Sequence, residues 1–223
     1  MRFSDFTSYD LILLAQGLGT NIALFLVTSL IGLLIGLSWA LVRFYRVPVL
    51  AQIVTFLSEL LKNSPVLVQL FLVFFGLPAL LHIRVTPVTA ATITLSANTA
   101  AFVYVIAVSA IESIEREQVE AARVFGLTRW QVLRHIVSPQ AAAFAVGPLV
   151  ALLVNQLQVT SLISVIGVVD LTKIGHILNL RTLKPFIVWT VVGLLYYLMA
   201  KLIARACAGL ETRLRAHSQW KGL

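Results

Sequence analysis

The chain has 223 residues, of which 59% are hydrophobic and only 12% are charged, and its mean hydropathy is +0.95. A soluble domain of this length carries about twice that density of charge, so the composition excludes an ordinary soluble protein and indicates that lipid surrounds the chain. The formal net charge of +8 does not indicate nucleic acid as a partner, because basic residues of membrane proteins collect on cytoplasmic loops.

The first segment, Met1 to Asn21, lacks the basic start and short apolar core of a signal peptide, since Arg2 is offset by Asp5 and Asp10. We expect it to form a short interfacial helix carrying Phe3, Phe6, Tyr9 and Leu11. Cys207 is the only cysteine. It excludes an intrachain disulfide and a cysteine-based metal cluster, and we expect no metal site.

The apolar runs predict an all-α integral membrane protein, a single domain over 1–223 with five membrane-spanning helices. The predicted spans cover about 18–42, 49–81, 87–111, 139–157 and 186–206. The second run is too long for one simple crossing, and Pro65 predicts a kink or break within it, because proline removes a backbone donor and displaces Ser64 from helical geometry. The fourth span begins at Pro139, a favourable first helical position.

An odd number of spans places the two termini on opposite sides, and basic residues choose between the orientations. With the N-terminus outside, eleven basic residues lie in the cytoplasm: Arg43, Arg46, Arg116, Arg123, Arg129, Arg134, Lys201, Arg205, Arg213, Arg215 and Lys221. Five then lie outside: Arg2, Arg84, Lys173, Arg181 and Lys184. We therefore predict an external N-terminus, a cytoplasmic C-terminus and a cytoplasmic loop over about 112–138.

The sequence of that loop predicts two short helices. In the first, residues 115–126, Val119, Ala122 and Phe125 have the spacing of one helical face, and Gly126 is expected to end the helix in left-handed geometry. Thr128, with Gln131 three residues on, predicts a capping box for a second helix that ends before the proline of the fourth span. The pattern alone leaves two alternatives open, an ordinary connector at the membrane surface and a docking surface for another protein.

The order Glu120-Ala121-Ala122, then Gly126, Ile136 and Pro139, resembles the EAA loop of the ABC importer permeases, although Ser138 stands where that family has leucine. In that family the first helix of the loop enters a groove on the ATP-binding subunit, and the fold is the type I importer fold. The resemblance therefore implies an ATPase-docking site, the cytoplasmic coupling helix between spans three and four, made by Glu120, Ala121, Ala122, Arg123, Phe125 and Gly126.

Two further segments are similar to the polar amino acid (His/Glu/Gln/Arg/opine) group of these permeases. They are Asn63 to Phe71, continuing to Phe75-Gly76-Leu77-Pro78, and Thr160 to Gly167, followed by Asp170-Leu171-Thr172. The resemblance implies a permease subunit in a bacterial inner membrane, serving binding-protein-dependent import of a polar amino acid or a related small solute. The implied partners are a second permease subunit, two ATP-binding subunits that hold ATP and Mg, and an extracytoplasmic solute-binding protein that docks around Arg84 and 170–184.

The chain has no P-loop, so we expect it to hydrolyse no ATP, to bind no cofactor of its own and to be no enzyme. The alternatives are an ATP-independent secondary transporter or channel subunit, and a membrane scaffold without transport. Five spans without an internal repeat count against the inverted-repeat plan of secondary transporters.

The sequence departs from the family at the substrate end. Val105 and Val108 stand where the family often has an acid and an arginine, and Gln158-Val159 replaces Lys-Asp. Two alternatives follow: a heterodimer whose other permease carries the charged contacts, which we favour, or a less polar substrate. Glu59 and Lys62 have the spacing of a pair on one helical face. The substrate-path candidates cluster where the fourth helix is expected to open: Asn155, Gln156, Gln158, Thr160 and Ser161, with Asn98 facing them.

Overall fold

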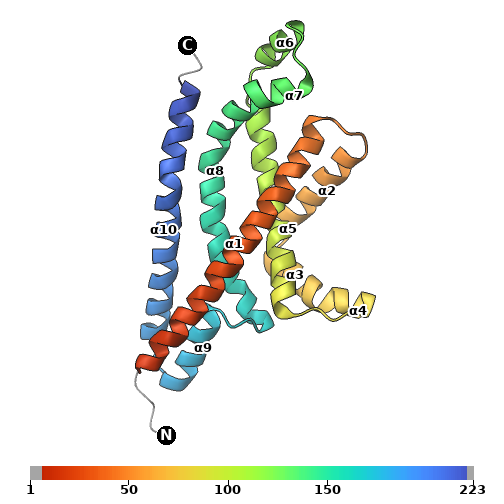
Figure 1. Ribbon diagram of the computed structural model, residues 1–223. Helices are drawn as coiled ribbons and strands as arrows, with labels where there is room; N and C mark the ends of the chain where they lie inside the picture. The colour runs from red at the N-terminus through yellow and green to blue at the C-terminus, as the bar shows by residue number, and fades with distance from the viewer. Residues whose placement is uncertain (1–6, 220–223) are drawn as a thin grey trace.

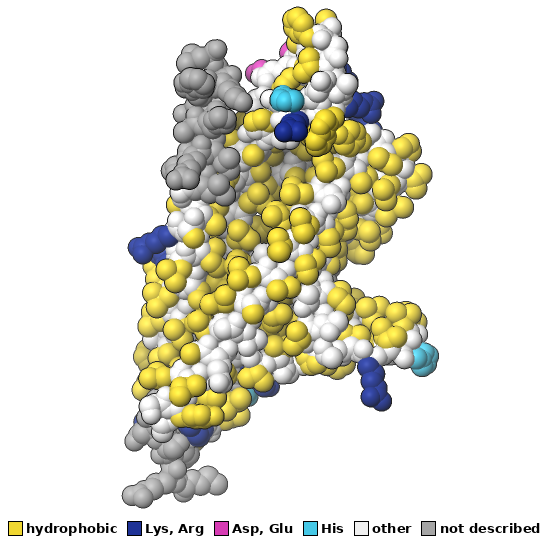
Figure 2. Space-filling model, in the orientation of Figure 1, with side chains coloured by type: hydrophobic (Ala, Val, Ile, Leu, Met, Phe, Trp, Pro, Cys, Tyr) yellow, Lys and Arg dark blue, Asp and Glu magenta, His cyan; other side chains and the backbone are white. Residues whose placement is uncertain are grey.

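The computed structural model describes residues 7–219, and the side chains of residues 7–209. The described chain is helical throughout and runs back and forth between the two ends of an elongated bundle (Figure 1). The first helix begins at one end and the last helix finishes at the other, beside the hairpin of α6 (Arg116–Val124) and α7 (Arg129–Val132). Hydrophobic side chains cover the middle of the face in Figure 2, and most of its charged side chains lie near the two ends.

The first helix, α1, covers Ser8–Phe44 in one piece. The expected separate interfacial helix is therefore wrong for its described part, since Tyr9 and Leu11 belong to α1, while Phe3 and Phe6 lie outside the described residues. No proline interrupts this stretch, and the Thr7 N–H donates to Asp10 Oδ2 at 2.8 Å at its start. Its 37 residues give a length of about 56 Å, and α1 accordingly runs obliquely across the bundle (Figure 1).

The second apolar run forms α2 (Leu50–Lys62), α3 (Val66–Phe71), a π-helical turn (Leu72–Gly76) and α4 (Leu77–Leu81). The predicted break at Pro65 is confirmed, because the chain bends by 107° between α2 and the following helices. Four helices of the described chain are long and apolar enough to cross a membrane, and this bent pair makes up to five.

The third run, α5 (Pro87–Glu112), has the predicted bounds to within one residue. Thr86 caps it by accepting a hydrogen bond from the Thr89 N–H at 3.1 Å. Helix α5 packs along α1 more extensively than any other pair of elements does. Helix α5 is the most buried of the membrane-spanning candidates, and α1 crosses the face of the bundle in front of it (Figure 1).

Beyond α6 (Arg116–Val124), one continuous helix runs from Arg129 to Ile166. It consists of α7 (Arg129–Val132), a π-helical turn (Leu133–Val137), α8 (Ser138–Val159) and a 3₁₀ segment (Thr160–Ile166). The expectation that the second loop helix ends before Pro139 is therefore wrong. The Ser138 N–H bonds to Leu133 O, five residues back, and this wider turn admits the proline ring without breaking the helix.

The last two helices are α9 (Leu171–Thr182), which the sequence analysis does not predict, and α10 (Pro185–Gln219). Helix α10 begins within one residue of the predicted fifth span and continues past its predicted end. Helix α9 packs between α1 and α10 at the end of the bundle away from the hairpin.

Candidate functional site

The hairpin of α6 and α7 projects from the end of the bundle at which α10 finishes (Figure 1). A small apolar cluster holds it to the body of the protein. Ala122 supplies the buried side chain of α6, at 6% exposure, and packs with Ile114, Val132, Leu133 and Val137. Gln140 Nε2 also donates to Gln118 Oε1 at 2.8 Å, which ties α6 to the start of α8.

The turn of the hairpin has the geometry that a glycine at the end of a helix produces. Gly126 has φ +80°, as predicted, its N–H bonds to Arg123 O at 2.9 Å, and the Leu127 N–H reaches Ala122 O at 3.1 Å. This pair of bonds is a Schellman motif, in which the residue after the glycine packs back onto the helix. Leu127, which the sequence analysis missed, therefore joins the cluster beneath α6.

The expectation that Phe125 lies on one helical face with Val119 and Ala122 is wrong. The helix ends at Val124, and the Phe125 side chain is 83% exposed. Val124, another residue that the sequence analysis missed, is 86% exposed. Of the six predicted docking residues, Ala122 is buried and the other five lie on the surface of the hairpin: Glu120, Ala121, Arg123, Phe125 and Gly126.

The start of α7 is capped as predicted. The Gln131 N–H donates to Thr128 Oγ1 at 3.3 Å, and the Thr128 N–H donates to Gln131 Oε1 at 2.8 Å. The two bonds satisfy donors that the first turn of a helix leaves open. The single turn of the hairpin is therefore fixed on both sides, by Gly126 at the end of α6 and by Thr128 at the start of α7, and the exposed apolar side chains lie on a defined backbone.

The predicted substrate-path residues divide into two sets. Gln156 and Thr160 are 1% and 0% exposed, and they bond within the bundle: Gln156 Nε2 donates to Thr28 Oγ1 at 3.1 Å, and Thr160 Oγ1 to Leu157 O at 2.6 Å. Asn98 is likewise buried, in α5. The second set lies on one helical face, at i, i+3 and i+6. Asn155 and Gln158 are exposed, and Ser161 is half-buried.

A buried polar network that the sequence analysis missed joins four elements around Asn21 of α1. Its Nδ2, which carries two hydrogens, lies 2.8 Å from Thr160 Oγ1, 3.1 Å from the Tyr196 hydroxyl and 3.3 Å from Asp170 Oδ2, and its Oδ1 accepts the Leu171 N–H at 2.9 Å. The Asn21, Thr160 and Asp170 side chains have no exposed surface. The network fixes the 3₁₀ segment and the start of α9 against α1 and α10.

Asp170 has two roles in this network. Its Oδ1 accepts the Lys173 N–H at 2.8 Å, which caps α9. Burial raises the pKa of its carboxyl above the ordinary value, against the lowering effect of the Lys173 and Asn21 donors. The Lys173 and Asn21 donors therefore offset part of the desolvation of this buried carboxyl group.

Two charged residues of α2 do not form the expected ion pair. Glu59 is exposed and Lys62 is half-buried, and within the described part of the chain the only ion pair joins Arg181 to Asp10. No group of three or more His, Cys, Asp or Glu side chains that could hold a metal ion occurs among the described residues.

Known proteins are similar to the chain over most of its length. A probable amino-acid ABC transporter permease protein of Bacillus subtilis, YckA, is 32% identical over 189 residues, which are 85% of this chain and 83% of the relative. The glutamine transport system permease protein GlnP of Escherichia coli is 29% identical over 185 residues, 82% of this chain and 84% of the relative.

Solved structures show the same fold. An amino acid ABC transporter crystallised with histidines matches with a TM-score of 0.84 at 26% identity, over 94% of this chain and all of the matched chain. The MetNI methionine ABC transporter, in an inward-facing conformation, matches with a TM-score of 0.81 at 19% identity, over 94% of this chain and 99% of the other. The all-helical arrangement of the described residues is thus that of an ABC permease.

The family model described as the inner membrane component of binding-protein-dependent transport systems matches residues 32–215. The matched region contains the hairpin, the polar face of α8 and most of the membrane-spanning helices. The chain therefore belongs to this family and is the inner-membrane permease subunit of an ATP-driven, binding-protein-dependent importer, with its ATPase on a separate subunit.

Proposed function

We propose that the α6–α7 hairpin docks onto the partner ATPase in the cytoplasm, with the N-terminus of the chain outside and its C-terminus inside. The observation that carries the proposal is the exposure of Val124 and Phe125, at 86% and 83%. They lie on a hairpin whose backbone is capped at the end of α6 and at the start of α7. Exposed apolar side chains on a rigid, polar-rimmed element are typical of a protein interface. Glu120 and Arg123 supply charges at its rim.

The imported solute is proposed to be a polar amino acid. Relatives named above serve glutamine and other amino acids, and the polar face of α8 suits an uncharged part of such a solute. Asn155 and Gln158 are exposed within an apolar helix, and an amide facing lipid leaves its hydrogen bonds unmade. We assign them, with Ser161, to a water-filled path between this chain and a second permease subunit.

The pairing of permease subunits is proposed to be heteromeric. Val105 and Val108 are half-buried and pack onto the cluster of Ala40, Val54 and Tyr104. They therefore have an internal packing role and offer no charge to a substrate. Charged contacts with the substrate would then come from the other permease subunit. The solute-binding protein is assigned to the opposite end of the bundle, near Arg84 and α9.

Phe125→Ala tests the docking site. We expect the variant to lower copurification of the partner ATPase about tenfold or more, as removal of an interface hot spot does. Glu120→Lys, which reverses a rim charge, should lower it as well. Phe186→Ala is the matched control, because Phe186 is 84% exposed and lies at the start of α10, away from the hairpin.

The measurement is the ratio of ATPase to permease after affinity purification in detergent. The variants change exposed side chains, so the size-exclusion profile of the permease should not change. Undiminished ATPase recovery with both Phe125→Ala and Glu120→Lys would refute the assigned interface.

A further inference from the structure

A large apolar groove runs along the face of the bundle on which α1 lies. Its volume is about 860 Å³, and α1, α5, α8 and α10 form its walls. A row of leucines from α1 lines one side, and alanines of α8 and α10 line the other. The leucines are Leu26, Leu30, Leu33, Leu37 and Leu41, and the alanines include Ala141, Ala142, Ala145 and Ala206.

Water is a poor occupant of this groove. Among the described residues its lining contains no charged side chain, and its hydroxyl groups are those of Ser29, Thr99 and Ser138. Thr99 already donates to Leu95 O at 2.8 Å. An apolar cavity of this kind stays dry, while an empty space of this volume forfeits the packing contacts of its walls. A hydrocarbon occupant satisfies both conditions.

The length of the groove suits an acyl chain. The leucine row extends from Leu26 to Leu41, which corresponds to about 22 Å of helix. One leaflet contributes about half of the roughly 30 Å hydrocarbon core of a bilayer, so an acyl chain of one leaflet can lie along this row within its length.

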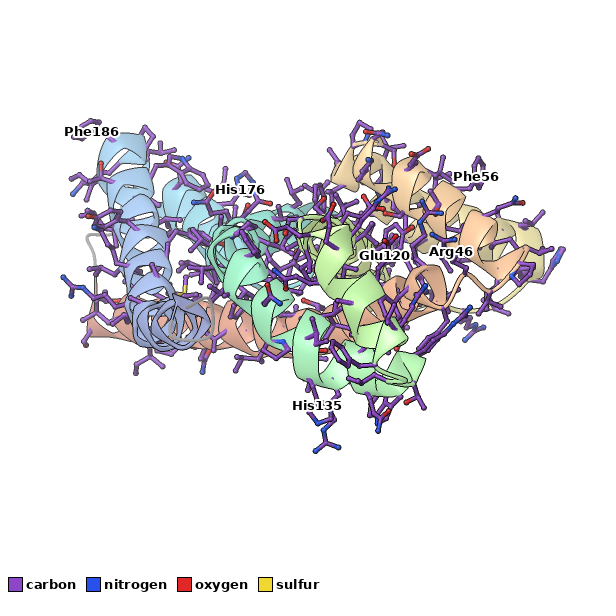
Figure 3. The ribbon with its side chains drawn as sticks, turned by 90° about the horizontal axis from the view of Figure 1, so that it is seen from above. Arg46, Phe56, Glu120, His135, His176 and Phe186 are labelled. Carbon is purple, nitrogen blue, oxygen red and sulfur yellow. The ribbon has the colours of Figure 1, made fainter. Side chains whose placement is uncertain are left out.

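A positively charged side chain, Arg134, lies at the hairpin end of the groove. Arg134 is exposed and lies one helical turn before Ser138, a lining residue. His135, next to it, projects to the side on which α1 lies, whereas His176 and Phe186 lie on the other side (Figure 3). Since the only ion pair among the described residues joins Arg181 to Asp10, the Arg134 guanidinium has no carboxylate partner among them.

We infer that the groove binds an anionic phospholipid of the leaflet beside the hairpin. The acyl chain lies between the leucine row of α1 and the alanines of α8, and Arg134 holds the phosphate of the headgroup. Basic side chains at the mouths of grooves between membrane-spanning helices bind anionic headgroups in this way. The site is separate from the polar face of α8, because neither Asn155 nor Gln158 lines the groove.

Photo-crosslinking tests the inference. The chain, purified with its partner subunits, is placed in nanodiscs containing phosphatidylglycerol or phosphatidylcholine that carries a diazirine on the acyl chain. Labelled peptides are then mapped by mass spectrometry. We expect labels on the groove-lining parts of α1 and α8, and about fivefold more label from phosphatidylglycerol, the preference that one basic side chain near an anionic lipid confers.

Two matched pairs of variants test the acyl-chain contact and the headgroup contact separately. Ala142→Phe fills the groove and should lower labelling by both lipids, whereas Ala151→Phe, on an exposed part of α8 outside the groove, should not. Arg134→Gln should abolish the preference for phosphatidylglycerol, and Arg129→Gln, on the same hairpin, should retain it. Both Arg variants change exposed residues, so this arm decides even where a filled groove impairs folding.

Three results would overturn the inference. Equal labelling by the two lipids in the unchanged protein would show that the groove has no preference for an anionic headgroup. Equal labelling of Ala142→Phe and Ala151→Phe would show that the acyl chain lies elsewhere. A cross-link from Cys207, a lining residue and the only cysteine of the chain, to a helix of another subunit would show that protein fills the groove.

Discussion

Asn21 of α1 has no exposed surface, and its amide lies within hydrogen-bond distance of four other residues. One amide therefore contacts two hydroxyls, a carboxyl group and a backbone N–H inside the bundle. A buried network of this kind stabilises strongly when complete, and each group left without a partner costs about 1–3 kcal/mol.

Asn21→Ala should therefore lower the thermal stability of the permease clearly, because it leaves the Leu171 N–H without a partner and the buried Asp170 Oδ2 with the Tyr196 hydroxyl as its remaining donor. Thr20→Ala is the control, since the Thr20 hydroxyl bonds only to Gln16 O, at 3.2 Å, in an exposed position. The measurement is the midpoint of thermal unfolding of the complex in detergent. Equal midpoints for the two variants would contradict the central role of Asn21.

The sequence could not predict this network. Gln156 and Thr160 are visible as polar residues in an apolar run, and the sequence analysis grouped them with Asn155 and Gln158. The partners of Asn21 lie 139 to 175 residues away along the chain, and no local pattern pairs residues at such separations. The face that each residue of α8 presents depends on where α1 and α5 pack, which only the folded structure provides.

Among the elements, α1 and α5 approach each other closely because glycines of α1 face α5. A Cβ atom added to Gly32 would lie 2.5 Å from Thr99 Cβ and 2.9 Å from Ser96 O, and one added to Gly36 would lie 2.6 Å from Ala100 O. Such small residues allow the backbones of membrane helices to come into contact.

Gly32→Ala should destabilise the α1–α5 contact by about 1–3 kcal/mol, the usual cost of an overpacked core. Gly19→Ala makes the same change on the same helix, where nothing lies within 4 Å of the added carbon. Alanine favours a helix over glycine by about 1 kcal/mol, so Gly19→Ala should be neutral or stabilising. Unfolding of the two variants side by side measures the difference, and a stabilising Gly32→Ala would contradict the close packing.

Most elements were predictable because their signals are local. Long apolar runs give the spans, Pro65 gives the break, and Thr128 with Gln131 gives the start of α7. Helix α9 was missed although its buried residues repeat with helical spacing: Leu171, Ile174, Gly175, Leu178 and Thr182. The continuity through Pro139 was not predictable, since the π-helical turn that admits the ring adjusts the backbone and leaves no trace in residue type.

At the scale of the molecule, the polar face of α8 and the hairpin lie at opposite ends of one helix, and they should fail in different ways. Gln158→Leu should lower amino acid uptake while ATPase association stays intact, because the residue is exposed in the proposed path and distant from the hairpin. Gln52→Leu, at an exposed position of α2, is a matched control outside that path and outside the hairpin. The assay is uptake by proteoliposomes that contain the ATPase and the binding protein.

If Gln158→Leu transports normally, the polar face is not the path. If the unchanged complex shows no solute-stimulated ATP turnover with any amino acid, the proposed solute class is wrong, although the family of the chain stands. The two failures can be told apart, because the first concerns one side chain and the second concerns every solute tested.

The helix from Arg129 to Ile166 contains no loop between the hairpin and the 3₁₀ segment. Its α8 part has 22 residues, a rod of about 33 Å, and departures from α-helical geometry flank it on both sides, at Leu133–Val137 and at Thr160–Ile166. A displacement of the hairpin should therefore reach Ser161 as a tilt of α8. We expect bending at the two flanking turns and at Pro148, which removes a hydrogen bond inside α8.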